Sequence, residues 1–197
     1  MPLALRLPFI ALSCLWLFGC AGTPSSKNAI SAAPSSVATT APAVPASART
    51  TALVRGNIII AGQPTADDLA AWRKEGVRGV FNVRTPTEMA DRSVVPFDEA
   101  AAADELGLTY DIQPIGGPAH PFGPEVLAAF AARVQAGNEP LLLHCGTGNR
   151  AGQLYAAYAV KYLGITPDEA MRDLEPLGLW PLPIERMTGM ELKLVPR

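Results

Sequence analysis

Cys145 and Arg150 are the residues of this sequence whose types and spacing best suit chemistry. They open and close a glycine-bearing loop after an apolar run, and the loop reads Cys145-Gly146-Thr147-Gly148-Asn149-Arg150. Its glycines allow a tight turn whose backbone N–H groups point inward, and the helix expected after it adds the positive end of its dipole. The loop is therefore predicted to bind an oxyanion, with a thiolate of Cys145 at its centre.

The same residue types are suited to nucleophilic catalysis. Helix-end N–H groups and the guanidinium of Arg150 favour the thiolate and would hold an incoming oxyanion in line for attack. Covalent catalysis through a thio-intermediate is the natural use of Cys145. His144 precedes it on the expected strand, so its side chain should face the other side of the sheet, where we expect it to brace the loop through hydrogen bonds.

Alternating strand and helix patterns surround this loop. The sequence predicts strands at 57–61, 77–84, 108–115 and 140–144, and helices at 66–75, 97–106, 124–136, 150–163 and 168–177. It predicts a loop at 85–88 and an irregular segment beyond Trp180. The alternation favours an α/β fold, a single domain with a mostly parallel central sheet flanked by helices. Because ligands gather at the carboxyl ends of parallel strands, Cys145 is expected at the functional edge.

The N-terminal part of the chain has a different composition. Residues 1–19 resemble a bacterial lipoprotein signal peptide, and Cys20 would become the lipidated first residue. The apolar stretch is shorter than the roughly 20 residues of a membrane-spanning helix, which disfavours the alternative of an uncleaved anchor. Residues 20–51 are mostly Ala, Ser, Thr, Pro and Val and are interpreted as a disordered tether, which leaves residues 52–197 as one globular domain.

This N-terminal resemblance implies a location and a membrane partner. The protein is expected in the bacterial cell envelope, anchored by its N-terminal lipid at the periplasmic face of the outer membrane. Cys14 would leave with the signal peptide and Cys20 would carry lipid, so Cys145 is the thiol of the mature domain and no intramolecular disulfide is expected.

Charge and composition exclude other functions. The net charge of −2 and the pI of about 5.7 provide no basic surface, so nucleic acid is not an expected partner. The 2 histidines and the remaining cysteine show no metal-ligand spacing, so neither a metal nor another cofactor is expected.

The predicted strand, His144-Cys145, the glycine loop, Arg150 and the following helix resemble the cysteine-dependent protein tyrosine and dual-specificity phosphatase superfamily. The segment 76–84, Gly-Val-Arg-Gly-Val-Phe-Asn-Val-Arg, is similar to an element of dual-specificity phosphatases. More narrowly, Gly62-Gln63-Pro64 and a Cys-x-x-Gly-x-Arg loop resemble the bacterial beta-lactamase-hydrolase-like, or phosphatase-like, family. This resemblance spans approximately Val54 to Leu179. It implies a phosphatase-like three-layer arrangement, a phosphoester substrate, and Cys145 as nucleophile.

The sequence departs from that superfamily in two places. The usual signature has five residues between Cys and Arg and a Ser or Thr after Arg, whereas here four intervene and Ala151 follows. Phosphatases of this type also carry an acidic Asp in the loop after the strand that corresponds to 108–115. Here the loop is Gly-Gly-Pro-Ala-His-Pro, so His120 is the candidate general acid, with Asp91 and Asp98 as distant alternatives.

Three interpretations of the loop therefore stay open. The first is phosphatase-like hydrolysis of a phosphoester. The second is sulfur transfer, because single-domain rhodaneses use a loop of this length, accept a sulfane sulfur on the thiolate and need no general acid. The third is a non-catalytic module that binds oxyanions.

Overall fold

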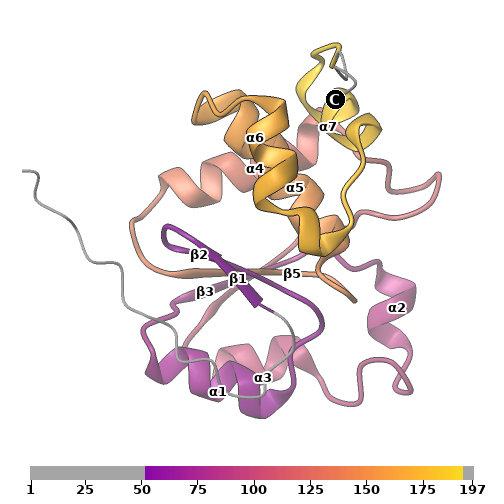
Figure 1. Ribbon diagram of the computed structural model, residues 1–197. Helices are drawn as coiled ribbons and strands as arrows, with labels where there is room; N and C mark the ends of the chain where they lie inside the picture. Colours follow the sequence, from indigo (N-terminus) through magenta and orange to yellow (C-terminus); the bar gives the residue numbers. More distant parts are fainter. Residues whose placement is uncertain (1–51, 193–197) are drawn as a thin grey trace, which may run out of the picture. The chain divides into compact units, whose positions relative to one another are not determined.

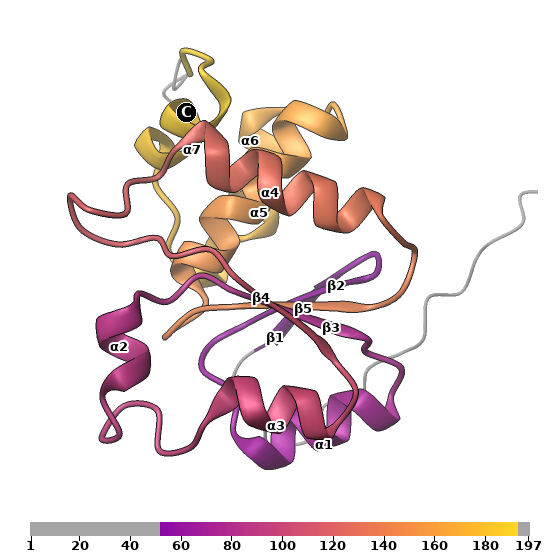
Figure 2. The same cartoon turned by 180° about the vertical axis from the view of Figure 1, so that it is seen from behind.

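The computed structural model describes residues 52–192, and the expected signal peptide, Cys20 and the tether lie outside them. The described residues form three layers, with helices on both faces of a five-stranded sheet (Figure 1). Helices α4, α5, α6 and α7 cover one face, and α1 and α3 cover the other (Figure 2). This is the predicted α/β arrangement. No helix within the described range is long and apolar enough to cross a membrane.

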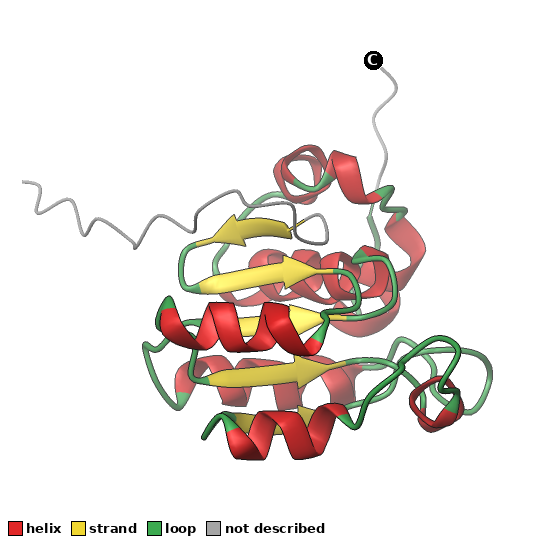
Figure 3. Ribbon diagram, turned by 90° about the horizontal axis from the view of Figure 1, so that it is seen from below, coloured by secondary structure: helices red, strands yellow, loops and turns green. Residues whose placement is uncertain are grey.

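The sheet is mostly parallel, as predicted. Its strands are β1 (Ala52–Arg55), β2 (Ile58–Ala61), β3 (Gly79–Asn82), β4 (Thr109–Ile112) and β5 (Leu141–His144). Their spatial order is β1-β2-β5-β3-β4, and only β1 runs antiparallel to its neighbour (Figure 3). The short edge strand β1 was not predicted. It forms because Gly56 has a φ of +61° and turns the chain back onto β2.

Within the described residues, eight helical segments connect and cover these strands. They are α1 (Ala66–Lys74), α2 (Pro86–Ala90), α3 (Glu99–Glu105), α4 (Pro124–Gln135), α5 (Asn149–Tyr162), α6 (Pro167–Asp173), the 3-10 helix η1 (Glu175–Leu177) and α7 (Pro181–Thr188).

The predicted loop at 85–88 is wrong, because this segment begins helix α2. The Thr85 side chain accepts a hydrogen bond from the Glu88 N–H, while the Glu88 carboxylate accepts from the Thr85 N–H. This reciprocal cap satisfies backbone groups that a first helical turn leaves free. It also fixes the position of Glu88 at the start of α2.

The predicted irregular segment beyond Trp180 is also wrong, because α7 forms there. Pro181 and Pro183 lie in its first turn, where the backbone N–H groups have no helical acceptor, so proline loses nothing. Ile184 and Met187 are fully buried against the helices above the sheet.

The core has two parts, one on each face of the sheet. Phe81, Leu143 and Cys145 belong to the cluster on the α4 and α5 side, whereas Val80 and Leu142 belong to the cluster on the α1 and α3 side. Successive residues of a strand point to opposite faces, so this division follows directly from the sequence of β3 and β5. The side chain of Cys145, at the start of the loop, therefore belongs to the larger apolar cluster.

Candidate active site

Cys145 lies at the carboxyl end of β5 and is almost completely buried, with 1% of its surface exposed. The Gly148 N–H donates a hydrogen bond to its Sγ atom over 3.2 Å. Gly148 has a φ of +90°, and a Cβ there would lie 3.2 Å from a Leu177 methyl carbon. Only glycine fits this position, and its conformation directs the backbone N–H at the sulfur.

The other loop residues divide between the site and its surroundings. Gly146 accepts a hydrogen bond through its carbonyl oxygen from the Gln63 N–H over 3.0 Å. The Asn149 amide donates to the carbonyl oxygens of Leu177 and Gly178, at 2.7 Å each. Thr147 is exposed to solvent. Of the residues predicted to bind an oxyanion, Asn149 therefore has its side chain committed to the segment before α7.

Arg150 is held by Glu88, a residue that the sequence analysis did not identify. Its Nη1 donates to Glu88 Oε2 over 2.9 Å and its Nη2 donates to Glu88 Oε1 over 2.7 Å. Nη1 also donates to the Ile115 carbonyl oxygen over 2.6 Å. A guanidinium has five N–H donors, so its Nε and the second Nη2 hydrogen remain available for an oxyanion beside Cys145.

The ion pair keeps both partners charged. The hydrogen bond from Arg150, opposed in part by burial, lowers the pKa of Glu88 to about 2. The Glu88 carboxylate likewise raises the pKa of Arg150, and the nearby Cys145 side chain adds to this effect. The guanidinium is thus a fixed positive charge next to the sulfur.

A buried polar cluster lies beneath the loop, on the α3 side of the sheet. Glu99 and His144 are both fully buried, and the His144 Nε2 atom lies 2.7 Å from Glu99 Oε1. The Tyr110 hydroxyl donates to the same Oε1 atom over 3.1 Å, and Asn82 donates to the Tyr110 oxygen over 2.7 Å. His144 thus faces away from Cys145, as the strand alternation predicts, and it is packed into a hydrogen-bonded network.

Glu99 remains ionised in this network. Burial is the largest influence and opposes ionisation, but hydrogen bonds and charge from His144, with further hydrogen bonds from Gln63 and Tyr110, outweigh it and lower the pKa of Glu99. The nearest sequence signal for this role is that Glu99 shares one helical face with Ala103, the other buried residue of α3.

The three candidate acids are placed differently. His120 closes the loop after β4, where its carbonyl oxygen accepts from the Gly116 N–H over 2.6 Å, and this loop adjoins Arg150 through Ile115. The His120 imidazole is half-buried and makes no hydrogen bond or ion pair with another described residue. The structure thus brings the His120 loop to the edge where Cys145 lies.

Asp91 and Asp98 serve local backbone structure instead. Asp91 accepts from the N–H and hydroxyl of Ser93, which lowers its pKa, so this exposed carboxyl is poorly suited to donating a proton. Asp98 caps α3 by accepting from the Ala101 N–H over 3.1 Å. Their contacts assign neither residue to the Cys145 loop.

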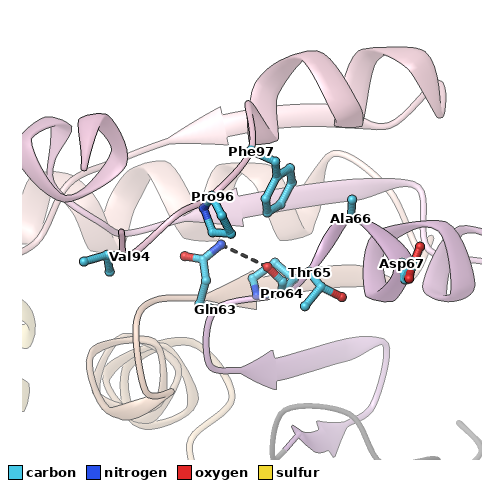
Figure 4. A pocket seen from close by; sticks show the side chains of 8 residues that line it. All are labelled: Gln63, Pro64, Thr65, Ala66, Asp67, Val94, Pro96 and Phe97. Carbon is cyan, nitrogen blue, oxygen red and sulfur yellow. Dashed lines mark hydrogen bonds between the residues drawn. The ribbon is translucent and has the colours of Figure 1, made fainter. Parts of the chain in front are cut away.

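A surface cavity of about 410 Å³ adjoins the loop through Gln63 (Figure 4). Its lining is largely apolar, and Pro96 and Phe97 face Gln63 and Pro64 across it. Since Gln63 also bonds to Gly146, a group bound here would lie next to the loop.

Sequence comparison gives a partial match. No protein-family model matches the chain. It is 30% identical over 105 residues to the beta-lactamase hydrolase-like protein of Xylella fastidiosa strain Temecula1, an alignment that covers 52% of this chain and 23% of that protein. The chain therefore spans about a quarter of the length of the curated relatives that it matches.

Structural comparison extends the match to the fold. A DUF442 protein from Shewanella putrefaciens CN-32, whose name describes it as a phosphatase, superposes with a TM-score of 0.57 and 19% identity, covering 72% of this chain and 91% of that one. PTPMT1 in complex with PI(5)P gives a TM-score of 0.57 at 16% identity, covering 68% and 90%. Kinase-associated phosphatase gives 0.56 at 15% identity, covering 66% and 84%. The described domain thus has the fold of the cysteine-dependent phosphatases, and its sequence is similar over part of its length to beta-lactamase hydrolase-like proteins.

Proposed function

We propose that this protein hydrolyses a phosphomonoester through the thiolate of Cys145. The observation that carries the proposal is the hydrogen bond from the Gly148 N–H to Cys145 Sγ, in a loop where the Cys145 side chain also helps to raise the pKa of the Arg150 guanidinium. Donors fixed around a nucleophile stabilise both the thiolate and the negative charge on a phosphoryl group under attack. The phosphatase fold of the domain supports the same reaction class.

The reaction has two steps. In the first, the thiolate donates an electron pair to phosphorus, an S–P bond forms, and the P–O bond to the alcohol or phenol breaks with its electrons on that oxygen, which takes up a proton. In the second, a water oxygen attacks phosphorus and gives up a proton, the S–P bond breaks, and phosphate and the thiolate are released. Arg150 and the loop N–H groups hold the phosphoryl oxygens throughout.

The test compares the full chain with a Cys145→Ser variant on an aryl phosphate, and in parallel on thiosulfate with cyanide as acceptor. We expect phosphate release by the wild type and a loss of at least about 1,000-fold in the variant. Thiocyanate formation without phosphate release would support sulfur transfer, which the short loop also allows. If neither product forms but sulfate stabilises the fold through Arg150, the loop is a binding module.

His120 is the proposed proton donor to the leaving group. Aryl phosphates with acidic phenols need little protonation, whereas those with weakly acidic phenols depend on it. A His120→Asn variant should therefore lose activity mainly on the second kind of substrate. An equal loss on both would assign His120 to binding or structure rather than to proton transfer.

We also propose that Cys20 is lipidated and tethers the domain to the cell envelope. A lipoprotein signal resemblance supports this, and residues 20–51 could reach between the membrane and the domain. Metabolic labelling with a radioactive fatty acid should mark the wild type but not a Cys20→Ala variant, and the variant should leave the membrane fraction. An unlabelled wild type in the soluble fraction would overturn the proposal.

A further inference from the structure

A second guanidinium, that of Arg84, lies at the Cys145 loop and takes no part in the steps above. Arg84 follows β3 and Cys145 follows β5, and these strands are parallel neighbours, so their ends meet at one edge of the sheet. A Cβ placed on Gly146 would lie 3.8 Å from Nη1 of Arg84 and also 3.8 Å from Nη2 of Arg150. Both guanidiniums therefore reach the loop at the same residue.

Arg84 has few partners for a buried cation. Only 3% of its side chain is exposed, and among the described residues its Nε atom has no hydrogen-bond partner. Its Nη1 donates to the neutral Gln63 amide oxygen over 2.7 Å. Its Nη2 lies 3.4 Å from Glu88 Oε1, an oxygen that is closer to Arg150 at 2.7 Å. Because buried charges are normally well paired, Arg84 retains charge and N–H groups that an anion can use.

Gln63 fixes the direction of the Arg84 guanidinium. The Gln63 Nε2 atom donates to the buried Glu99 carboxylate over 2.5 Å and to the Pro64 carbonyl oxygen over 3.2 Å, the bond drawn in Figure 4. These bonds occupy the amide nitrogen and turn the amide oxygen toward Arg84. The polar cluster beneath the sheet thus orients a cation at the loop, in the same way that Glu88 orients Arg150.

Two guanidiniums at the loop share one carboxylate, that of Glu88. The two hydrogen bonds from Arg150 to Glu88 pair one positive with one negative charge, and Arg84 adds a second positive charge. Asp91 is close enough to Arg84 for its pKa to be lowered by it, although Ser93 has the larger effect, and Asp91 is fully exposed to solvent. The proposed Cys145 thiolate adds a second negative charge, so without Arg84 the loop would meet an incoming anion with a net negative charge.

We propose that Arg84 is a second anion-binding residue of the Cys145 loop, and that its charge makes the site select dianions over monoanions of the same shape. The inference rests on the proposed function for its substrate class, because the phosphoryl group of a monoester is a dianion near neutral pH. Coulomb attraction grows with the charge of the ligand, so the positive charge of Arg84 acts more strongly on a dianion.

Tungstate and perrhenate test this, since both are tetrahedral oxyanions of similar size and differ by one charge. Calorimetric titration of the full chain should show tighter binding of tungstate. Arg84→Gln should weaken tungstate binding about 10- to 100-fold and perrhenate binding much less. Arg84→Lys should keep the preference. Arg78→Gln is the matched control, because Arg78 precedes β3 at its other end and donates to backbone carbonyl oxygens there.

Unchanged tungstate affinity in Arg84→Gln, or an equal loss for both anions, would overturn the proposal. If that variant does not fold, a crystal structure of the wild type with tungstate tests whether Arg84 contacts the anion. A tungstate oxygen within about 3.2 Å of an Arg84 nitrogen supports the proposal, and tungstate held by Arg150 and the loop alone contradicts it. Binding needs no turnover, so a wild type that prefers tungstate but releases no phosphate rejects the proposed hydrolysis and keeps this role for Arg84.

Discussion

The two faces of the sheet support the same loop by different means. On the α4 and α5 side, Cys145 lies within a continuous apolar cluster, where Phe130 makes edge-to-face contacts with Phe81 and Tyr158 at ring-centroid distances of 5.2 and 5.4 Å. On the α3 side, Glu99 and His144 form a buried polar cluster that reaches the loop through Gln63. Packing therefore determines where the end of β5 lies, and directional hydrogen bonds determine how the loop leaves it.

The largest expected loss of stability comes from a substitution that removes packing on the apolar face. Phe130 is completely buried, so Phe130→Ala should lower the free energy of unfolding by about 3–5 kcal/mol. Urea unfolding measures this loss, and tungstate affinity of the folded protein should not change. Phe130→Leu is the control, and it should cost less because it keeps most of the apolar volume. Unchanged stability together with weaker tungstate binding would break the division between the faces.

Substitution of Glu99 tests the polar face. A Glu99→Gln side chain places an amide N–H₂ where the structure needs an acceptor for several buried donors. We expect a loss of about 1–3 kcal/mol of stability and, unlike for Phe130→Ala, weaker tungstate binding. Glu105→Gln, at the exposed end of the same helix, should change neither quantity. If Glu99→Gln lowers stability alone, the polar cluster supports the fold but not the loop.

The ion pair of Glu88 with Arg150 makes the stability of the loop depend on pH. Its pKa is about 2 when folded and 4.5 ordinarily, so its carboxylate contributes stability fully above the ordinary value, and this contribution is lost as the pH falls toward about 2. The difference in unfolding free energy between wild type and Glu88→Gln should be constant near neutral pH and shrink between about pH 5 and pH 2. Urea unfolding over a pH series measures it.

Glu169→Gln is the matched control for that experiment. Glu169 forms the same kind of capping box with Thr166 at the start of α6, but it is fully exposed and makes no hydrogen bond to a guanidinium. Its effect should be smaller at every pH. Equal pH profiles for the two variants would show that capping, rather than the bond to Arg150, dominates at Glu88.

The smallest expected effect is at Gly152, in the apolar face of α5. Alanine favours a helix interior by about 1 kcal/mol, but its Cβ would lie 2.7 Å from a Leu177 methyl carbon. Because that methyl group can move, the two effects should nearly cancel and Gly152→Ala should change stability by less than about 1 kcal/mol. In a Leu177→Ala background the same change should stabilise, which a thermal-unfolding double-mutant cycle would detect.

Much of the fold could be predicted from local sequence patterns. The apolar runs at β2, β3 and β5 and the capped helices between them specify a parallel sheet, and short connections restrict its topology. Helix α2 escaped prediction because it has no buried face, and only its capping box indicates it. In α7 the number of prolines concealed a helix, since their effect depends on position within the first turn.

The site residues also differ in whether local sequence patterns could predict them. Cys145 and Arg150 are close in the chain, so their spacing alone revealed the loop. Glu88 lies 62 residues from Arg150, and Glu99 lies 36 residues from Gln63, so only the folded sheet brings these partners together. The residue types of Glu88 and Glu99 did not indicate these roles, because a charged side chain in a short polar segment is usually solvated.

The position of β5 in the sheet has a consequence for folding kinetics. This strand is the last of the five in the sequence, yet it lies between β2 and β3. A nascent chain that ends before Leu141 leaves β2 and β3 without their shared neighbour, so the native sheet cannot assemble stepwise from its N-terminal end. Entry of β5 closes the sheet and creates the loop in one late event, and strand pairings this distant in sequence make that event slow. During synthesis, Cys145 therefore reaches its native surroundings only after β5 has emerged and paired with β2 and β3.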